Sequence, residues 1–243
     1  EVRDKQLASE WSYGAPGDPG QFKLWGNNSN GQLGQNSTQD ISSPVQIPGE
    51  WTGVFASGSG EGTQGGVKSD GTMWTWGFNL NGQGGRNDRV HRSSPVQVGA
   101  DTTWATGVLR TGNYWAMALK TNGTLWTWGR NNEGISGNND LTFRSSPTQV
   151  GTDTTWNYAQ DKYDGDGQTV MVIKTNGTLW SWGASMAGGL GLNDRTSRSS
   201  PCQVGTDTTW NVVSVSSNSA FSVKTNGTLW AWGVNEYGEL GQN

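Results

Sequence analysis

KTNGTLWTWG, residues 120–129, recurs almost unchanged as KTNGTLWSWG at 174–183 and KTNGTLWAWG at 224–233. KSDGTMWTWG at 68–77 is a diverged copy, and KLWG at 23–26 keeps only the end of the phrase. The Trp-Gly pairs of these five copies follow one another at intervals of 50 to 54 residues. The chain therefore repeats one structural unit, and the physical needs of that unit decide the fold.

Each unit divides into four predicted strands. The first starts at a recurring Trp, as in 51–56 and 210–215, and the second leads into a turn, as in 115–120. The third is the alternating LWTWG segment at 125–129, and the fourth is the SPVQV segment at 94–98, which follows a loop rich in Gly and Asn. Four short antiparallel strands in a repeat of about 50 residues are typical of a β-propeller blade.

The turn between the second and third strands has the sequence Asn-Gly in three units, at Asn122-Gly123, Asn176-Gly177 and Asn226-Gly227. This dipeptide is typical of a two-residue hairpin turn in which both residues have positive φ. We therefore predict such a turn in each of these units.

Tryptophan follows the repeat closely. Of the 15 Trp residues, 13 lie at recurring positions, and only Trp11 and Trp115 do not. One blade cannot bury both of its faces, so blades must stack, and large indole rings are suited to fill the space between them. We expect the Trp of each Trp-Gly pair to pack one blade on the next: Trp76, Trp128, Trp182 and Trp232.

Composition narrows the classes of function. The net charge is −4, whereas nucleic-acid-binding domains are usually basic, so no nucleic-acid partner is expected. The sequence has no run of 18 apolar residues, so we expect no membrane insertion. The one cysteine, Cys202, replaces a small residue of the fourth strand and is expected to be a core-edge residue.

The unit GTLWxWGxNxxGxLGxN followed by SPxQV resembles the regulator-of-chromosome-condensation repeat family, best at 25–36 and 232–243. The near-identical copies resemble its prokaryotic and phage-borne members. The resemblance implies a β-propeller, usually of seven blades. This chain departs from the family by lacking its Gly-x-x-His segment, since the only His is His91 in another loop. We expect an all-β propeller of about five four-stranded blades, or an incomplete larger ring.

No catalytic arrangement, phosphate-binding loop or Cys/His metal spacing is found, so we expect neither enzyme activity nor a cofactor. His91 is expected to be a solvated loop residue. Asp161, Asp164 and Asp166 with two glycines form a weak calcium candidate, because the spacing of an EF-hand is not met. The alternative for these aspartates is a solvated loop.

Two groups of residues are candidates for binding a partner. Arg92, Arg144 and Arg198 each precede Ser-Ser-Pro and should form an arc at one rim, either for an anionic partner or in pairs with local acids. The loops between the first and second strands differ between units, and their aromatic candidates are Tyr114, Trp115 and Tyr163. The alternative is that these loop sequences vary because neither packing nor function constrains them.

We divide the chain into a charged tether and linker at 1–21 and a propeller at 22–243. The first hypothesis is a non-enzymatic binding or structural module on a virion, tail or cell surface, contacting a protein or receptor and joined to a larger assembly through 1–21. The second is a lectin-like glycan binder. The third, by analogy with the family, is an intracellular regulator of a small GTPase or a chromatin contact, although fold alone does not imply function.

Overall fold

The computed structural model describes residues 22–56, 62–106, 110–111, 114–157, 169–215 and 219–241. The described part is all-β, with one short 3-10 helix, η1 (Met186–Gly188). It contains no helix of the length and apolarity needed to cross a membrane. Residues 1–21 lie outside it, so the tether remains a prediction.

The strands form five antiparallel sheets that follow the sequence repeat. The first sheet pairs β1 (Lys23–Gly26) with β2 (Ile41–Gln46). The second has the order β3 (Trp51–Ala56), β4 (Thr63–Lys68), β5 (Met73–Gly77), β6 (Arg92–Gln97). The third has the order β7 (Arg110–Thr111), β8 (Trp115–Leu119), β9 (Leu125–Gly129), β10 (Arg144–Gln149).

The fourth sheet contains β11 (Thr169–Ile173), β12 (Leu179–Gly183) and β13 (Arg198–Gln203). The fifth contains β14 (Trp210–Val215), β15 (Ser219–Lys224) and β16 (Leu229–Gly233). The first sheet thus has only the third and fourth strands of the repeat, and the fifth has only the first three. Antiparallel blades of a propeller are confirmed, and five units are present.

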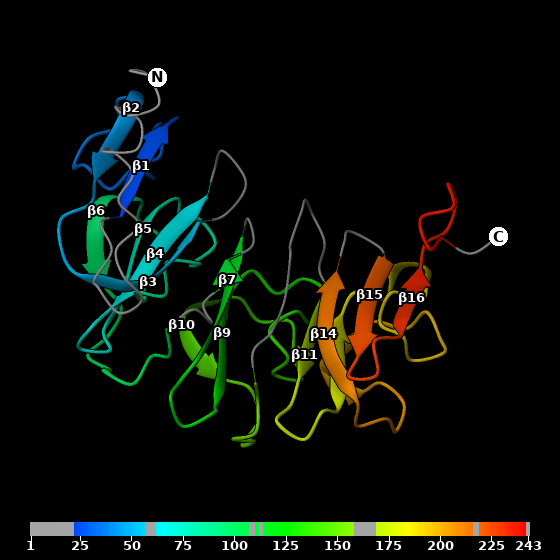
Figure 1. Cartoon of the computed structure of the whole chain (residues 1–243). Coiled ribbons are helices and arrows are strands. Elements are labelled where there is room, and N and C mark those ends of the chain that lie inside the picture. The colour runs from blue at the N-terminus through cyan, green and yellow to red at the C-terminus, as the bar shows by residue number, and fades with distance from the viewer. Residues whose placement is uncertain are drawn as a thin grey trace, which may run out of the picture.

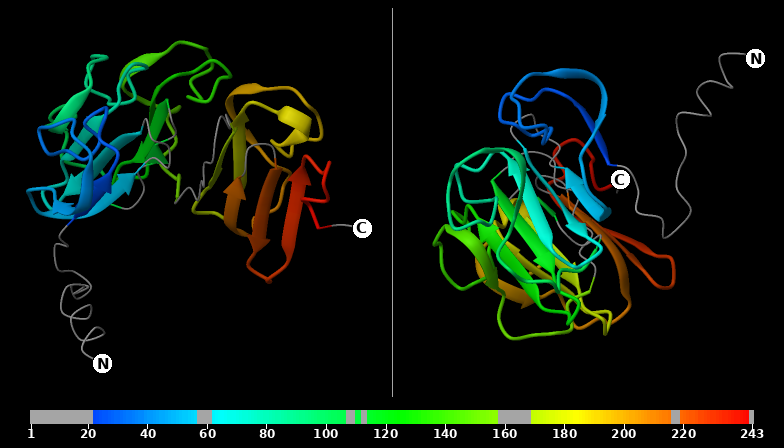
Figure 2. Two further views of the ribbon diagram at one scale, coloured as in Figure 1. Left: turned by 90° about the horizontal axis from the view of Figure 1, so that it is seen from above. Right: turned by 90° about the vertical axis from the view of Figure 1, so that its left-hand side faces the viewer.

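The five sheets lie one after another along an open arc, with β1 and β2 at one end and β16 at the other (Figures 1 and 2). The first or second strands of neighbouring units contact each other: β3 contacts β7, and β11 contacts β14. Of the two expected arrangements, this is the incomplete ring.

The turn between the second and third strands differs from the prediction. In the third unit only Gly123 has positive φ, 78°, and Asn122 does not. The Gly123 amide donates to the Lys120 carbonyl at 2.9 Å, and the Asn122 Oδ1 accepts from the Thr124 amide at 3.1 Å. The prediction of positive φ at both residues was wrong, because a three-residue loop needs one left-handed residue, here glycine.

The core lies between neighbouring sheets. Trp115 and Leu125 of the third sheet pack in one buried cluster with Val170, Val172 and Trp182 of the fourth. Because interior sheets are covered on both faces, a strand such as β8 is buried at every position. Stacking of units therefore supplies the burial that a single sheet cannot achieve.

Candidate functional site

Each complete contact between neighbouring units contains the same tryptophan hydrogen bond. The indole of the Trp-Gly pair reaches back and donates its Nε1–H to a backbone carbonyl in the preceding unit. The bonds are Trp76 to Gln32 (2.9 Å), Trp128 to Gln83 (2.8 Å), Trp182 to Ile135 (2.8 Å) and Trp232 to Gly189 (3.0 Å). These four residues thus combine apolar burial with a directional bond that fixes how one blade sits on the next.

A second recurring cluster joins a lysine, two tryptophans and an aspartate. The Lys120 Nζ lies 3.8 Å from the ring centroid of Trp126 and 5.0 Å from that of Trp104, and it forms an ion pair with Asp101. Lys174 and Lys224 occupy the same place in the next two units, against Trp180 and Trp230. A cation over these indole faces stabilises the cluster and occupies surfaces that a sugar ring would use.

The aspartates of these clusters are held in the charged form. Partial burial raises the pKa of Asp101, but hydrogen bonds from Lys120 and Thr103 outweigh it and lower that pKa to about 2. Partial burial also raises the pKa of Asp153, but hydrogen bonds from Lys174 and Thr155 lower that pKa to about 2. Since each carboxylate already has its cation, the arrangement is suited to structure and has no free acid or base.

A pocket of about 470 Å³ opens between the second and third sheets, lined in part by Arg86, Trp104, Lys120, Trp126 and Pro147. The Arg86 guanidinium is held by the Thr75 Oγ1 at 2.6 Å and the Val90 carbonyl at 2.9 Å. Burial lowers the pKa of Arg86 to about 10. The Arg86 guanidinium is therefore held by groups of its own unit.

The three predicted arginines are each the first residue of a fourth strand, and each pairs with an aspartate four residues earlier, in the preceding loop. Arg92 pairs with Asp88 at 2.8 Å, Arg144 with Asp140 at 2.6 Å, and Arg198 with Asp194 at 2.6 Å. The hydrogen bond from Arg144 lowers the pKa of Asp140 to about 2. The structure thus places an arc of ion pairs at this edge, which is the alternative left open by the sequence.

Apolar side chains project from the same loops. We call the loops between the third and fourth strands of units two to four, residues 78–91, 130–143 and 184–197, the outer rim. Four large apolar residues of the outer rim are more than half exposed: Leu80 (55%), Val90 (54%), Leu141 (59%) and Met186 (63%). The outer rim therefore combines apolar side chains with fixed charges, which sequence reasoning missed because these residues do not recur.

The aromatic candidates are placed differently from one another. Tyr114 is partly buried. Its ring centroid lies 5.4 Å from the Arg130 Cζ and 6.4 Å from the ring centroid of Phe78. Trp115 lies in the core cluster and is 4% exposed, so it is not available to a ligand at the surface. Tyr163 lies outside the described residues.

The calcium candidates Asp161, Asp164 and Asp166 also lie outside the described residues. Among the residues that the structure does describe, no group of three or more His, Cys, Asp or Glu side chains could hold a metal ion. The calcium hypothesis therefore remains a prediction about 161–168.

His91 is more than a solvated loop residue. Its ring stacks on Phe78 with centroids 4.9 Å apart, and its Nδ1 accepts a hydrogen bond from the Asn79 amide at 2.9 Å. Partial burial and nearby Arg86 lower the pKa of His91, which keeps the ring neutral. Cys202 is a partly buried free thiol in β13, in keeping with a core-edge residue.

Comparison with known proteins agrees with this architecture. The family model "Regulator of chromosome condensation (RCC1) repeat" matches residues 24–61 and 176–223. The Ultraviolet-B receptor UVR8 of Arabidopsis thaliana is 28% identical over 217 residues, covering 88% of this chain and 49% of that protein. The probable E3 ubiquitin-protein ligase HERC3 of Homo sapiens is 33% identical over 106 residues, 43% of this chain and 10% of that protein.

Among solved structures, the crystal structure of Kap60 bound to yeast RCC1 (Prp20) matches with a TM-score of 0.75 and 18% identity. The match covers 93% of this chain and 55% of that one, so the chain spans about half the length of UVR8 and of the matched yeast chain. The recurring Trp-Gly units, the five stacked antiparallel sheets and these matches together show β-propeller blades that are similar to those built from RCC1 repeats.

Proposed function

We propose that this chain is a non-enzymatic protein-binding module whose partner contacts the outer rim. The observation that carries the proposal is the set of four exposed apolar side chains, Leu80, Val90, Leu141 and Met186, in the same loops as the aspartates of the arginine–aspartate pairs. Scattered single apolar residues are ordinary on a protein surface, but their gathering in one loop class is a feature of interaction sites.

The chemistry of the outer rim favours a protein over a nucleic acid or a glycan. Arg92, Arg144 and Arg198 each pair with their own aspartate, and the chain as a whole has a net charge of −4, which does not favour a polyanion. Protein interfaces typically combine apolar anchors with arginine and a polar surround. A glycan would need open aromatic faces, and in units three and four the repeating indoles of the third strand are covered by Lys120 and Lys174.

Two settings follow from this module. In the first, the propeller is displayed on a virion, tail or cell surface and joined to a larger assembly through residues 1–21. In the second, it regulates an intracellular partner, which the relatives favour because yeast RCC1 (Prp20) was solved bound to another protein, Kap60. Both settings use the same protein-binding surface, so the rim can be tested before the setting is known.

The test uses peptides selected against the immobilised chain from a displayed random library. We expect selected peptides to bind the Leu80→Ser/Leu141→Ser double variant at least about tenfold more weakly, since about 1.4 kcal/mol corresponds to a factor of ten. Val54→Ser, which changes another exposed apolar residue in β3, is the matched control and should leave the affinity unchanged.

Two results would overturn the proposal. One is that no selected peptide distinguishes the rim variant from the control. The other is that a glycan array gives specific binding while the peptide library gives none, which would favour the lectin-like hypothesis. Antibody labelling of purified particles and of cell surfaces then separates display from an intracellular role.

A further inference from the structure

Two arginines of the outer rim stand outside its arginine–aspartate pairs. Arg89 and Arg195 are both exposed. Within the described ranges, neither guanidinium forms an ion pair with an acidic side chain. Arg92 and Arg198 of the same two units, by contrast, are each held by an aspartate. Arg89 and Arg195 can therefore pair with a carboxylate that comes from another molecule.

The repeat places an exposed leucine between these two arginines. Arg89 follows Trp76 by 13 residues, and Arg195 follows Trp182 by the same interval. The residue at this position of unit three is Leu141, which is 59% exposed. Units two, three and four follow one another along the arc (Figure 1), so the outer rim presents Arg, Leu and Arg in that order.

Each of these three residues is the middle residue of a short turn. The aspartate before it accepts a hydrogen bond from the amide of the residue after it: Val90 donates to Asp88 at 3.1 Å, Thr142 to Asp140 at 2.9 Å and Thr196 to Asp194 at 2.8 Å. The same aspartates pair with the arginines that begin the fourth strands. Both ends of each turn are thereby fixed, so a partner would not have to order the turn on binding.

The loops of units two and three are also tied to the unit that follows. The Asn87 amide donates to the Ser145 carbonyl, and the Asn139 amide donates to the Ser199 carbonyl, both at 2.7 Å. These bonds hold each loop against the fourth strand of the next unit. The stacking of the units thus sets the spacing of the three exposed positions, which form a preformed surface.

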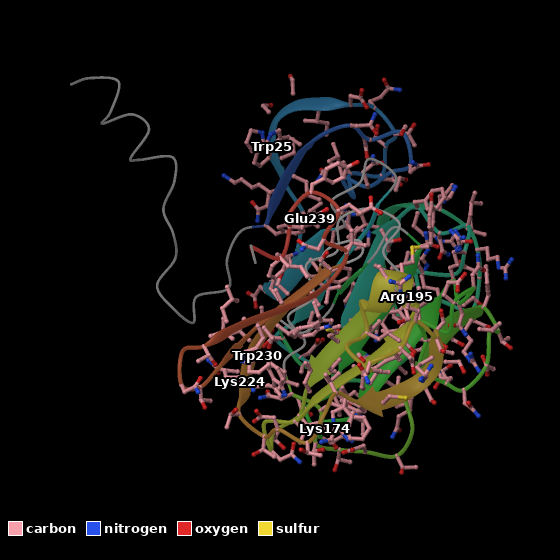
Figure 3. All side chains as sticks on the ribbon, turned by 90° about the vertical axis from the view of Figure 1, so that its right-hand side faces the viewer. Trp25, Lys174, Arg195, Lys224, Trp230 and Glu239 are labelled. Atoms are coloured by element: carbon pink, nitrogen blue, oxygen red, sulfur yellow. The ribbon has the colours of Figure 1, made fainter. Side chains whose placement is uncertain are left out.

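The outer rim also differs in charge from the rest of the chain. Together with the first residue of each following strand, it contains seven arginines and four acidic residues, a net charge of +3. The net charge of the whole chain is −4, so the rest of the chain carries −7. Figure 3 shows Arg195 well apart from Lys174 and Lys224, whose charges are paired with Asp153 and Asp207. An acidic partner would therefore be attracted to the outer rim and repelled by the rest of the surface.

We propose that the partner at the outer rim is an acidic protein segment in which an apolar residue lies between two carboxylates. The carboxylates pair with Arg89 and Arg195, and the apolar residue packs on Leu141. Arginine binds a carboxylate through two parallel hydrogen bonds, and arginine beside an apolar anchor is characteristic of protein interfaces. Two separate arginines match two carboxylates and not the dense charge of a nucleic acid. This inference rests on the proposed function, because it names the chemistry of the partner at the same surface.

The probes are the peptides selected from the displayed random library whose binding the Leu80→Ser/Leu141→Ser variant weakens. They are synthesised with a fluorescein label and titrated with the full chain, and binding is followed by fluorescence anisotropy. Their sequences should be acidic, with an apolar residue between two Asp or Glu residues. Their affinity should fall at least about fivefold when NaCl is raised from about 0.05 M to about 0.5 M, because salt screens exposed charges.

Charge-matched variants of the chain test the two arginines. Arg89→Gln and Arg195→Gln each remove one exposed charge that forms no ion pair within the described ranges, and circular dichroism should show both variants folded. Each change should weaken peptide binding at least about threefold, and the double variant at least about tenfold, since effects at separate sites add. Lys23→Gln removes one exposed charge from β1 and should leave the affinity unchanged.

Three results would overturn this inference while the proposed function stands. The first is that rim-dependent peptides are neutral or basic. The second is that Arg89→Gln and Arg195→Gln bind these peptides no more weakly than Lys23→Gln does. The third is that a thymidine oligonucleotide binds more tightly than the peptides and depends on the same two arginines. The absence of any rim-dependent peptide would instead overturn the proposed function, and this inference with it.

Discussion

The hydrogen bond between units is tested most cleanly by comparing two Trp→Phe changes in one core cluster. Trp182 is fully buried and donates its Nε1–H to the Ile135 carbonyl at 2.8 Å. Trp115 is 4% exposed, belongs to the same cluster, and its Nε1 has no hydrogen-bond partner. Both changes remove a similar apolar volume, but only Trp182→Phe breaks a bond between units.

The difference between the two variants follows from the cost of an unmade bond. A buried carbonyl left without a donor costs about 1 to 3 kcal/mol, whereas Trp115→Phe removes a donor that was already unpaired. Trp182→Phe should therefore lower the free energy of unfolding by about 2 kcal/mol more than Trp115→Phe. For a chain of this size, this difference corresponds to roughly 4 to 8 °C in melting temperature.

Urea and thermal unfolding, followed by circular dichroism, measure both quantities. The slope of the urea transition should be equal in the two variants, so that the midpoints can be compared directly. If Trp115→Phe destabilises the chain as much as Trp182→Phe, the bond to the preceding unit contributes nothing and the reasoning fails.

Three further predictions concern the turns, the aspartates and the rim. Gly123→Ala should lower the free energy of unfolding, measured by thermal unfolding, by at least about 2 kcal/mol more than Gly227→Ala. Both glycines have positive φ, but only a Cβ at Gly123 would clash with the next unit, 2.0 Å from the Thr154 carbonyl oxygen. The free energy of unfolding should fall as the pH drops from about 4 to about 2, because the unfolded chain takes up protons on Asp101 and Asp153 before the folded chain does. Urea midpoints measured against pH should fall less over this range in the Asp101→Asn/Asp153→Asn variant. Arg144→Ala should change the unfolding free energy by less than about 1 kcal/mol, as partly exposed ion pairs do, and a larger loss would assign its pair with Asp140 to stability.

The sequence was informative where residues recur. The spacing of the Trp-Gly pairs was enough to predict stacked antiparallel blades, because packing requires the same residue in each unit. The spacing also makes the Arg–Asp pairs visible, since an aspartate stands four residues before Arg92, Arg144 and Arg198. The carbonyl that each indole meets could not be predicted, because it lies 43 to 47 residues earlier and depends on how two units are stacked.

Residues that do not recur were harder to interpret. Trp115 was a binding candidate because it ends a loop, 110–115, that differs between units, yet β8 is covered on both faces and buries it. The continuous apolar run WAMAL around it was the available signal, since a strand covered on both faces reads as apolar throughout. Leu80 and Leu141 gave no signal at all, because a single apolar loop residue acquires meaning only when folding places several on one surface.

The most direct test of the stacking is hydrogen exchange at the indole Nε1–H groups, measured by NMR on the chain with ¹⁵N-labelled tryptophan. Trp76, Trp128, Trp182 and Trp232 should exchange slowly because each is bonded to the preceding unit. Trp25 is their counterpart at the start of the arc and is 53% exposed, so it should exchange rapidly. Exchange of the four bonded indoles as fast as that of Trp25 would contradict the stacked propeller.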